Sequence, residues 1–360
     1  MLIQAKILKN ALSKLIGIIP AKSTIPILEN VLFDFKEYFL HISASDLDIC
    51  GVACVPYEVK MPNFCLNAKR LYDTVKMIED DEIEFKMKDG YKLTIKTLRG
   101  EYKLTAENPQ DYPHLPKEEN LIELPKILDK IKKVVYACAS DELKPAMTGV
   151  LVGDDVVATD GHVLSLCSFP EVQKELNLSL PKGTNILIPQ KVLNIVLKSI
   201  SENTDICANE KTIKFYFKNE DFEYSIISKL IDEQYPNYKA VLPTDYTNRV
   251  WIKRSDLLNS IRRLIIFSSS VSHQIKITFC DKIEIRAIDS DVGAEAIESL
   301  EIKSENDGIP TEIGLNAEYA IKTLQSMTDE EIMIEYDTPI KALVLEGENH
   351  KCIIMPVRIN

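Results

Sequence analysis

Apolar residues recur at helical spacing in six stretches of this chain. Three of these amphipathic stretches open long segments of the sequence and cover residues 6–17, 124–140 and 253–269. In the middle stretch Ile127, Ile131 and Val134 follow at i, i+4 and i+7, which is one face of a helix. The other three stretches are alike in pattern and begin at Leu66, Ile188 and Leu315, at intervals of 122 and 127 residues. The chain therefore predicts helices in a repeat of domain size.

Alternating apolar and polar residues follow each helix of the second set, at residues 81–87, 204–217 and 330–336. This period of two is typical of strands with one buried face. Tyr-Pro turns close the first two repeats, at Tyr112 and Tyr235. We therefore predict an α+β fold of three similar domains, each with two helices packed on antiparallel sheets. Their expected bounds are residues 1–120, 121–246 and 247–360.

Positive charge is concentrated in the predicted helices, although the chain has a formal net charge of -12. Residues 6–17, 68–79, 124–140, 188–200, 253–269 and 316–327 hold 17 Lys and Arg against five Asp and Glu. Lysines on solvated helix faces are one reading of this bias. The other is that all six helices face one polyanion, because phosphate contact needs cations at a surface and reads no sequence.

A ring of helices fits the second reading if two chains contribute. Helices pack 8–10 Å apart, so six alone would close only a narrow ring. Twelve helices give a circumference of roughly 110 Å and a diameter through the helix axes of roughly 35 Å. After one helix diameter is subtracted, a duplex fits inside. A head-to-tail pair of chains would supply twelve.

The sequence contains few features that would indicate a metal site, a disulfide or a cofactor site. The eight cysteines form no CxxC pair and do not cluster with the five histidines, so we expect buried thiols and no structural metal or disulfide frame. No cofactor motif is present. We find no membrane-spanning apolar run, and the N-terminus is too polar for a signal peptide, which predicts a cytoplasmic protein with no membrane partner.

Two segments invite an enzymatic reading, and we reject both. Asp160 and His162 flank Gly161, but neighbouring side chains rarely form a catalytic dyad, and Asp-Gly is an ordinary turn signal. The acidic run 79–82 suits a solvated turn better than a Mg²⁺ site. We expect a protein that is not an enzyme. A three-domain protein-binding adaptor that does not encircle DNA is the alternative, and a metal-dependent nuclease is a third reading.

Four short motifs carry a family resemblance that runs over essentially the whole chain. They are Thr24-Ile25-Pro26-Ile27-Leu28, Thr159-Asp160-Gly161-His162, the turn from Tyr235 to Pro243, and Ile353-Ile354-Met355-Pro356-Val357-Arg358. Because these motifs occur in this order and at this spacing, the chain resembles the bacterial DNA polymerase III beta subunit, the beta sliding clamp. The resemblance implies three DNA-clamp domains that close as a head-to-tail dimeric ring. It also implies a non-catalytic processivity factor that encircles double-stranded DNA.

The resemblance further implies a hydrophobic groove for short peptide motifs of the DNA polymerase III alpha subunit, the clamp loader and other clamp-binding-motif proteins. By matching position, the groove residues would be Met147, Thr159, Gly161, His162, Val163, Leu164, Pro236, Ala240, Val241, Asn316, Tyr319, Ile340, Ala342, Ile353, Ile354, Met355 and Pro356. Many family members carry a basic residue where Val163 and Ala240 stand, and Asn360 extends the usual end by one residue. These departures affect the expected peptide preference.

For DNA contact, Lys22 matches a family position. The remaining candidates are chosen by their place on the basic helix stripes and are Lys9, Lys14, Lys69, Arg70, Lys126, Lys130, Lys133, Lys191, Lys198, Arg262 and Arg263. Ile266 and Phe267 match positions at the family's homodimer interface. Burial in an ordinary helix core is the alternative for these two residues.

Overall fold

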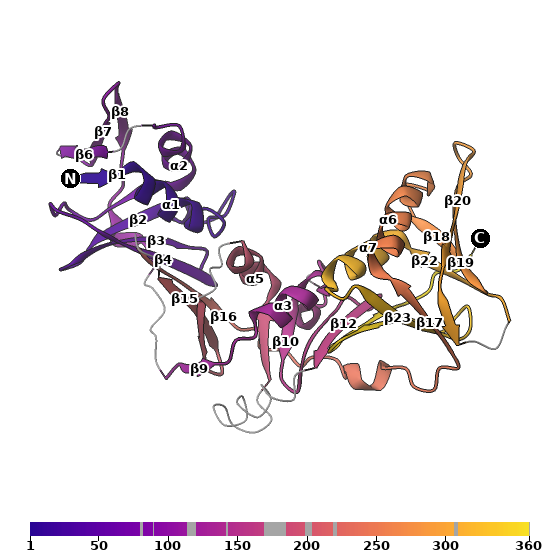
Figure 1. Cartoon of the computed structure of the whole chain (residues 1–360). Helices are drawn as coiled ribbons and strands as arrows, with labels where there is room; N and C mark the ends of the chain where they lie inside the picture. Colours follow the sequence, from indigo (N-terminus) through magenta and orange to yellow (C-terminus); the bar gives the residue numbers. More distant parts are fainter. Residues whose placement is uncertain are drawn as a thin grey trace. The chain divides into compact units, whose positions relative to one another are not determined.

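The computed structural model describes residues 1–79, 82–88, 90–113, 120–141, 143–168, 185–198, 204–218, 222–305 and 309–359. Contacts between Cα atoms divide the chain into two compact units (Figure 1). Unit 1 comprises Met1–Lys126 and Lys191–Leu230, and unit 2 comprises Ile127–Gln190 and Ile231–Asn360. Each unit is considered by itself.

One module, strand–helix–three strands, accounts for almost every element of both units. In the first third of the chain its two copies are β1 (Leu2–Gln4), α1 (Ala5–Leu15), β2 (Asn30–Phe35), β3 (Phe39–Ser45) and β4 (Ile49–Pro56), then β5 (Phe64–Asn67), α2 (Ala68–Lys76), β6 (Glu82–Lys88), β7 (Lys92–Lys96) and β8 (Glu101–Thr105). In the second they are β9 (Ile122–Leu124), α3 (Leu128–Val134), β10 (Gly149–Val152), β11 (Asp155–Thr159) and β12 (Val163–Ser168), then β13 (Ile186–Pro189), α5 (Gln190–Leu197), β14 (Thr204–Ala208), β15 (Thr212–Lys218) and β16 (Glu223–Lys229). In the third they are β17 (Asn248–Lys253), α6 (Arg254–Leu264), β18 (Gln274–Phe279), β19 (Lys282–Asp289) and β20 (Ala294–Glu301), then β22 (Thr311–Asn316), α7 (Ala317–Ser326), β23 (Glu331–Tyr336), β24 (Leu343–Gly347) and β25 (His350–Ile354).

The short strand β21 (Lys303–Glu305) is an addition to this pattern and pairs with β17. Short 3-10 turns lie between some of these elements; they are η1 (Pro26–Glu29), η2 (Pro109–Asp111), η3 (Val135–Ala137), η4 (Pro145–Thr148), η5 (Tyr238–Val241) and η6 (Ile265–Phe267). The predicted α+β repeat of two helices and antiparallel strands in each third is confirmed.

Strands from different modules join into large antiparallel sheets. In unit 1 the order is β5-β2-β3-β4-β16-β15-β14-β9, and β4 pairs with β16 from Cys54↔Glu223 to Ile49↔Ser228. In unit 2 the order is β13-β10-β11-β12-β25-β24-β23-β17-β21, and β12 pairs with β25 from Val163↔Ile354 to Cys167↔His350. We call the β4/β16 junction the first seam and the β12/β25 junction the second seam.

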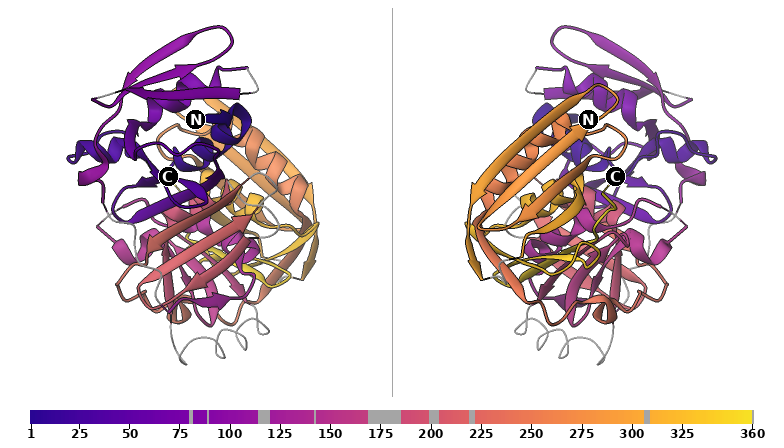
Figure 2. Two further views of the ribbon diagram at one scale, coloured as in Figure 1. Left: turned by 90° about the vertical axis from the view of Figure 1, so that its left-hand side faces the viewer. Right: turned by 90° about the vertical axis from the view of Figure 1, so that its right-hand side faces the viewer.

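Each unit also contains a four-stranded sheet, with the order β1-β6-β7-β8 in unit 1 and β20-β19-β18-β22 in unit 2. Helix α1 packs against α2 in unit 1, and α6 packs against α7 in unit 2 (Figure 1). Figure 2 shows the orange strands of β18–β20 lying across α6, which contacts β19 and β20. The four-stranded sheet of unit 2 thus has α6 over one face.

The amphipathic pattern of α1 explains its packing on the first seam. Leu8, Leu12 and Leu15 are buried at one-turn intervals, and α1 contacts β3 and β4 beneath it. Gly51 of β4 permits this close approach, because a Cβ at that position would lie 2.4 Å from Ile18 Cδ1. The hydroxyl of Tyr224 on β16 donates to the Lys14 carbonyl at 2.8 Å and ties the helix to the other side of the seam.

The predicted helix boundaries need two corrections. The patterns from Leu66, Ile188 and Leu315 begin in strands β5, β13 and β22, and each helix follows its strand without a loop. The pattern over 124–140 is wrong at both ends, since α3 spans only Leu128–Val134 and is followed by η3. Pro125 accounts for the extended Leu124 at the end of β9, because the residue before a proline is disfavoured in the helical conformation.

None of the described helices has the length and apolar character that a membrane span requires. Five of the eight cysteines are buried as expected: Cys50, Cys65, Cys138, Cys167 and Cys352. Burial raises the pKa of the Cys138 thiol to about 12, which keeps it neutral and apolar in character. The structure contains no cluster of three or more His, Cys, Asp or Glu arranged for a metal ion within its described residues. Asp80, Asp81, His114 and Asn360 lie outside those residues.

Candidate functional site

All seventeen candidate groove residues belong to unit 2, and the second seam forms their centre. Val163 lies opposite Ile354, and Leu164 lies opposite Ile353. These four side chains are at most 5% exposed. Leu164 and Ile353 share one apolar cluster with Tyr238, Tyr246 and Val344, and half-buried Ala342 packs against it. Leu164 and Ile353 therefore form the apolar floor of this face of the sheet, whereas Val163 and Ile354, one position along each strand, face the other side.

The β11–β12 turn brings Thr159, Gly161 and His162 to the end of this floor. The Asp160 carboxylate accepts the backbone N–H groups of His162 and Val163 at 2.7 and 2.8 Å. Thr159 donates its hydroxyl to the Val163 carbonyl at 2.7 Å. Gly161 has a φ of +92°, a conformation that favours glycine. The interpretation of Asp-Gly as a turn is confirmed, and the Asp160 carboxylate is engaged in holding the backbone.

His162 joins this turn to helix α7. Its ring stacks on Tyr319 with 6.0 Å between centroids and 18° between planes, and its carbonyl accepts the Met355 N–H at 2.9 Å. Asn316 caps α7 by accepting the Glu318 and Tyr319 N–H groups. Burial, and then the Asp160 charge, raises the pKa of Tyr319, so its hydroxyl stays a neutral donor.

Several candidate residues project apolar surface into solvent around this centre. Met355 is 46% exposed, Val241 is 62% exposed and Ile340 is 86% exposed. Val241 ends η5, which is anchored because the Tyr238 hydroxyl donates to Asp155 at 2.9 Å. Exposed apolar side chains that border an apolar floor are typical of a surface that binds a partner.

The remaining groove candidates come from separate elements of unit 2. Met147 is half-buried on η4, and its carbonyl accepts the Ala139 N–H at 2.9 Å. Pro236 and Ala240 are exposed on either side of the start of η5. Pro356 is half-buried and follows Met355. The structure thus joins Val163, Leu164, His162, Tyr319 and the β25 residues by direct contacts, and sets the others on the elements that surround them.

In unit 1 the DNA candidates lie on or beside three helices. Lys9 on α1, Lys69 and Arg70 on α2, Lys198 just after α5 and Lys22 in the loop after α1 are exposed. Lys14 is half-buried, and burial lowers the pKa of its ammonium group. Lys191, in the first turn of α5, forms an ion pair with Asp46.

Lys126 was placed on a helix stripe by the sequence, and this placement is wrong. It precedes α3, and it is the last residue of the first segment of unit 1. In unit 2 Lys130 and Lys133 do lie on α3, and the Lys133 ammonium donates to Thr328 at 3.1 Å.

Helix α6 carries two neighbouring arginines in different states. Arg262 is exposed, and the described residues show it in no ion pair. Arg263 donates twice to the Glu298 carboxylate on β20, at 2.7 and 2.6 Å. This bidentate bond raises the pKa of Arg263 and lowers that of Glu298. Helical spacing placed both arginines, but it gave no sign that one is neutralised.

The alternative reading of Ile266 and Phe267 as helix core is wrong. Both lie on η6, where Ile266 is 77% and Phe267 39% exposed. Sequence reasoning missed other exposed apolar residues near the outer strands of the four-stranded sheets, such as Met77, Tyr102 on β8 and Ile297 on β20. For Ile297 the signal in the sequence was the alternation of apolar and polar residues within 294–301. This alternation predicts a strand, but it does not tell which of its two faces is exposed.

Comparison with protein families agrees with the resemblance. Residues 1–116 match the N-terminal domain, 122–237 the central domain and 239–358 the C-terminal domain of the DNA polymerase III beta subunit. The beta sliding clamp of Halalkalibacterium halodurans is 27% identical over 356 residues, which cover 92% of this chain and 91% of that protein. The Bacillus subtilis beta sliding clamp is 24% identical over 99% of this chain and 98% of its own length.

Solved structures show the same fold. The DNA polymerase sliding clamp from Bacillus subtilis superposes with a TM-score of 0.85 at 22% identity and covers 100% of this chain and 99% of its own. The C. crescentus beta sliding clamp gives a TM-score of 0.87 at 22% identity, with 99% of both chains covered. The three matched domains span nearly the whole sequence in the family's order. The chain therefore belongs to the DNA polymerase III beta subunit family, the beta sliding clamps.

Proposed function

We propose that this chain is a DNA sliding clamp, a non-catalytic processivity subunit that closes with a second copy into a ring around duplex DNA. The observation that carries the proposal is the pattern of strand pairing at the ends of the six modules. Three tandem domains with the bounds 1–120, 121–246 and 247–360 would each contribute two modules. A clamp acting on chromosomal DNA would work in the cytoplasm.

First strands pair only within their own third of the chain, whereas last strands join one third of the chain to another. The last strands β4 and β16 pair antiparallel with each other, and so do β12 and β25. The last strands of the other two modules, β8 and β20, have one described neighbour each, β7 and β19. If the remaining last strands also pair antiparallel with each other, β8 of one chain pairs with β20 of another. Two such junctions close a head-to-tail dimer, which leaves neither edge exposed.

The surfaces beside these two edges are complementary in charge and apolar character. Next to β8, a shallow hollow of about 540 Å³ is lined by residues that include Lys69, Arg70, Met77 and Tyr102. Beside β20 stand exposed Ile266 and Phe267, and β20 itself carries Glu295, Glu298 and Glu301. Apolar side chains from η6 would enter the hollow. Glu295 and Glu298 are paired with Arg286 and Arg263, so Glu301, which forms no ion pair within the described residues, is the β20 carboxylate that would face the cations. Such pairing sets both affinity and orientation.

Two copies would supply the twelve helices that a ring wide enough for a duplex needs. The basic bias of the helix segments then places cations toward the phosphates, and the contact is non-specific because it reaches no base edge. Exposed Lys9, Lys22, Lys198 and Arg262 are the side chains that we assign to this role, and Lys14, Lys126, Lys130 and Lys133 are further candidates for it. Lys69 and Arg70 line the hollow at the proposed dimer junction and are assigned to that contact instead.

We further propose that the seventeen candidate residues around the second seam bind short peptide segments of partner proteins. Polymerase is the partner class that the family implies. The DNA polymerase III alpha subunit, the clamp loader and other clamp-binding-motif proteins are the specific partners proposed. Adaptable Met355, Val241 and Ile340 around an apolar floor suit aliphatic or aromatic anchors. Because exposed Ala240 is uncharged, the rim beside it should favour apolar over acidic peptide residues, whereas Val163 is buried and does not reach the rim.

Retention on DNA of different topology tests the proposed function. The purified protein is placed by a clamp loader on nicked circular DNA, and the circles are then separated by gel filtration before and after linearisation. A clamp stays on the circle in moderate salt and is lost from the linear form. The alternative, a protein-binding adaptor, predicts equal behaviour on both forms, and chelator-sensitive cleavage of the DNA would indicate a nuclease.

A further inference from the structure

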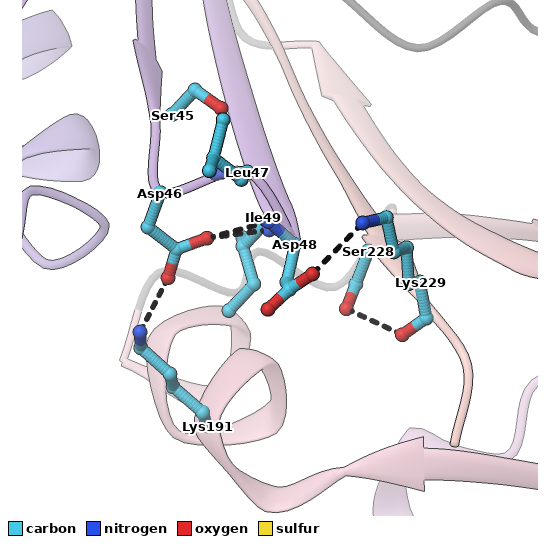
Figure 3. Close-up of polar contacts among 8 residues, drawn as sticks. All are labelled: Ser45, Asp46, Leu47, Asp48, Ile49, Lys191, Ser228 and Lys229. Atoms are coloured by element: carbon cyan, nitrogen blue, oxygen red, sulfur yellow. Dashed lines mark hydrogen bonds and ion pairs between the residues drawn. The ribbon is translucent and has the colours of Figure 1, made fainter. Parts of the chain in front are cut away.

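The turn between β3 and β4 forms ion pairs with two elements of another module. Figure 3 shows Asp46 and Asp48 of this turn facing Lys191 on α5 and Lys229 at the end of β16. Asp46 pairs with Lys191, and the Lys229 ammonium lies 2.9 Å from an Asp48 carboxylate oxygen. The Lys229 N–H also donates to the Asp48 carbonyl at 2.9 Å. All four residues belong to unit 1, beside the first seam.

The two oxygens of Asp46 have different roles. Oδ1 accepts the N–H groups of Asp48 and Ile49, at 3.0 and 2.6 Å, and so builds the turn. Oδ2 receives the Lys191 ammonium. Ser45 Oγ accepts the N–H of Leu47, whose φ of +81° is unfavourable for a residue with a Cβ. The turn is thus held by local hydrogen bonds, and the Asp46 charge is directed at Lys191.

The two ion pairs differ in burial. The Asp46 side chain is 7% exposed while that of Lys191 is 62% exposed, so a fixed carboxylate holds a cation that water reaches. Asp48 and Lys229 are 73% and 63% exposed. An ammonium group that water reaches gains little from one ion pair, so another anion that reaches Lys191 can displace the Asp46 carboxylate. A DNA phosphate brings the same charge and similar acceptor geometry to a lysine.

We propose that Asp46 is an internal competitor for DNA phosphate: it holds Lys191 in the unloaded clamp and releases it when a duplex occupies the ring. The inference rests on the proposed function, and it adds an autoinhibitory contact that lowers non-productive DNA affinity. Lys198, just after the same helix, is exposed and has no such partner among the described residues. Lys191 and Lys198 therefore contribute differently to DNA binding.

The first test compares Asp46→Asn with Asp48→Asn. The asparagine carbonyl at position 46 still accepts both turn N–H groups, so only the charge facing Lys191 is removed. Binding of each protein to a 30-base-pair duplex is measured by fluorescence anisotropy across a salt series. We expect Asp46→Asn to raise affinity several-fold at low salt and to steepen the slope of log K against log salt by about one. Asp48→Asn changes the net charge equally but frees Lys229, and should have the smaller effect.

A double-mutant cycle assigns the effect to Lys191. Lys191→Gln alone should weaken duplex binding less than Lys198→Gln, because Lys191 is already neutralised. In the Asp46→Asn background, Lys191→Gln should abolish the gain. Equal gains from both Asp→Asn variants, or a gain that survives Lys191→Gln, overturn the proposal. If Asp46→Asn does not fold, the comparison of Lys191→Gln with Lys198→Gln decides alone.

These experiments can refute the role of Asp46 without refuting the proposed clamp function, and the reverse. Retention of the wild-type protein on circular DNA with no difference among the variants would refute competition by Asp46 and leave the clamp function intact. Loss of wild-type retention on circles would refute the clamp function, whatever the duplex titrations give.

Discussion

Ser165 and His350 are 185 residues apart in the sequence, and their side chains meet in the second seam with 2.9 Å between Oγ and Nε2. Cys352 Sγ lies 3.2 Å from the same ring nitrogen. All three residues are buried. Next to them Tyr136 donates to Thr323 on α7 at 3.0 Å, so the network reaches from η3 to α7 across the seam. A neutral polar network thus holds the second seam, whereas exposed ion pairs flank the first.

Acid should weaken the second seam through His350. Burial lowers the pKa of this imidazole from 6.5 to about 4; the Lys133 and Lys130 charges act in the same direction, and Asp329 opposes them. Between these two pH values the unfolded chain binds a proton that the folded chain does not. The free energy of unfolding therefore falls as pH drops from 6.5 to about 4, by about 3 kcal/mol.

Denaturant unfolding of the wild type and His350→Gln at pH 7, 5.5 and 4.5 measures this effect. The stability difference between the two proteins should shrink toward acid. The half-buried His41 in unit 1 also has a pKa lowered by burial, but it is present in both proteins and cancels. A difference that stays constant over this range would contradict the assignment.

Met355→Asp should weaken partner-peptide binding at least tenfold without unfolding the protein. The side chain is partly exposed, and the backbone N–H keeps its bond to His162. A charge there would have to lose water when an apolar anchor binds. Titration of a labelled clamp-binding peptide gives the affinity, and Val59→Asp, at an exposed apolar position in unit 1, is the matched control. Ile354 is unsuitable for this test because it is fully buried.

Reversing the charge of Arg262 should reduce retention of the clamp on DNA more than reversing the charge of Arg263. Arg262→Glu replaces an exposed cation with an anion, whereas Arg263 is already paired with Glu298. The half-life of the loaded clamp on nicked circles, measured at low salt, should shorten several-fold for Arg262→Glu. Equal half-lives for Arg262→Glu and wild type would show that this side of α6 does not face DNA.

Ile266→Lys should convert the dimer to a monomer. The residue is mostly exposed in the single chain, and a lysine in the hollow beside β8 would lose water next to Lys69 and Arg70, which carry the same charge. Sedimentation velocity distinguishes the two states. Ile340→Lys makes the same change at another exposed position and should remain dimeric. An unchanged sedimentation coefficient for Ile266→Lys would place the dimer contact elsewhere.

The groove candidates illustrate how far sequence matching reaches. Matching by position named Leu164 and Ile353 as one site, and the structure places them opposite each other across the second seam. Matching by position does not predict how exposed a side chain is. It therefore treated buried Ile354 and exposed Met355 as equivalent. Exposure depends on which strand pairs with β25, and that strand, β12, is distant in the sequence.

By itself, the sequence determined the six helices, the threefold repeat and the family. Helical periodicity and short motifs reflect neighbours a few residues apart, which the chain carries in its linear order. Only the tertiary structure decided which cationic side chains are free to bind DNA and which sheet edges lack a neighbouring strand. Lys191 lies seven residues before Lys198, and Arg263 is next to Arg262, yet carboxylates from a distant turn and a distant strand neutralise Lys191 and Arg263. An ion pair or a sheet edge depends on distance in space, and periodicity along one helix holds no information about it.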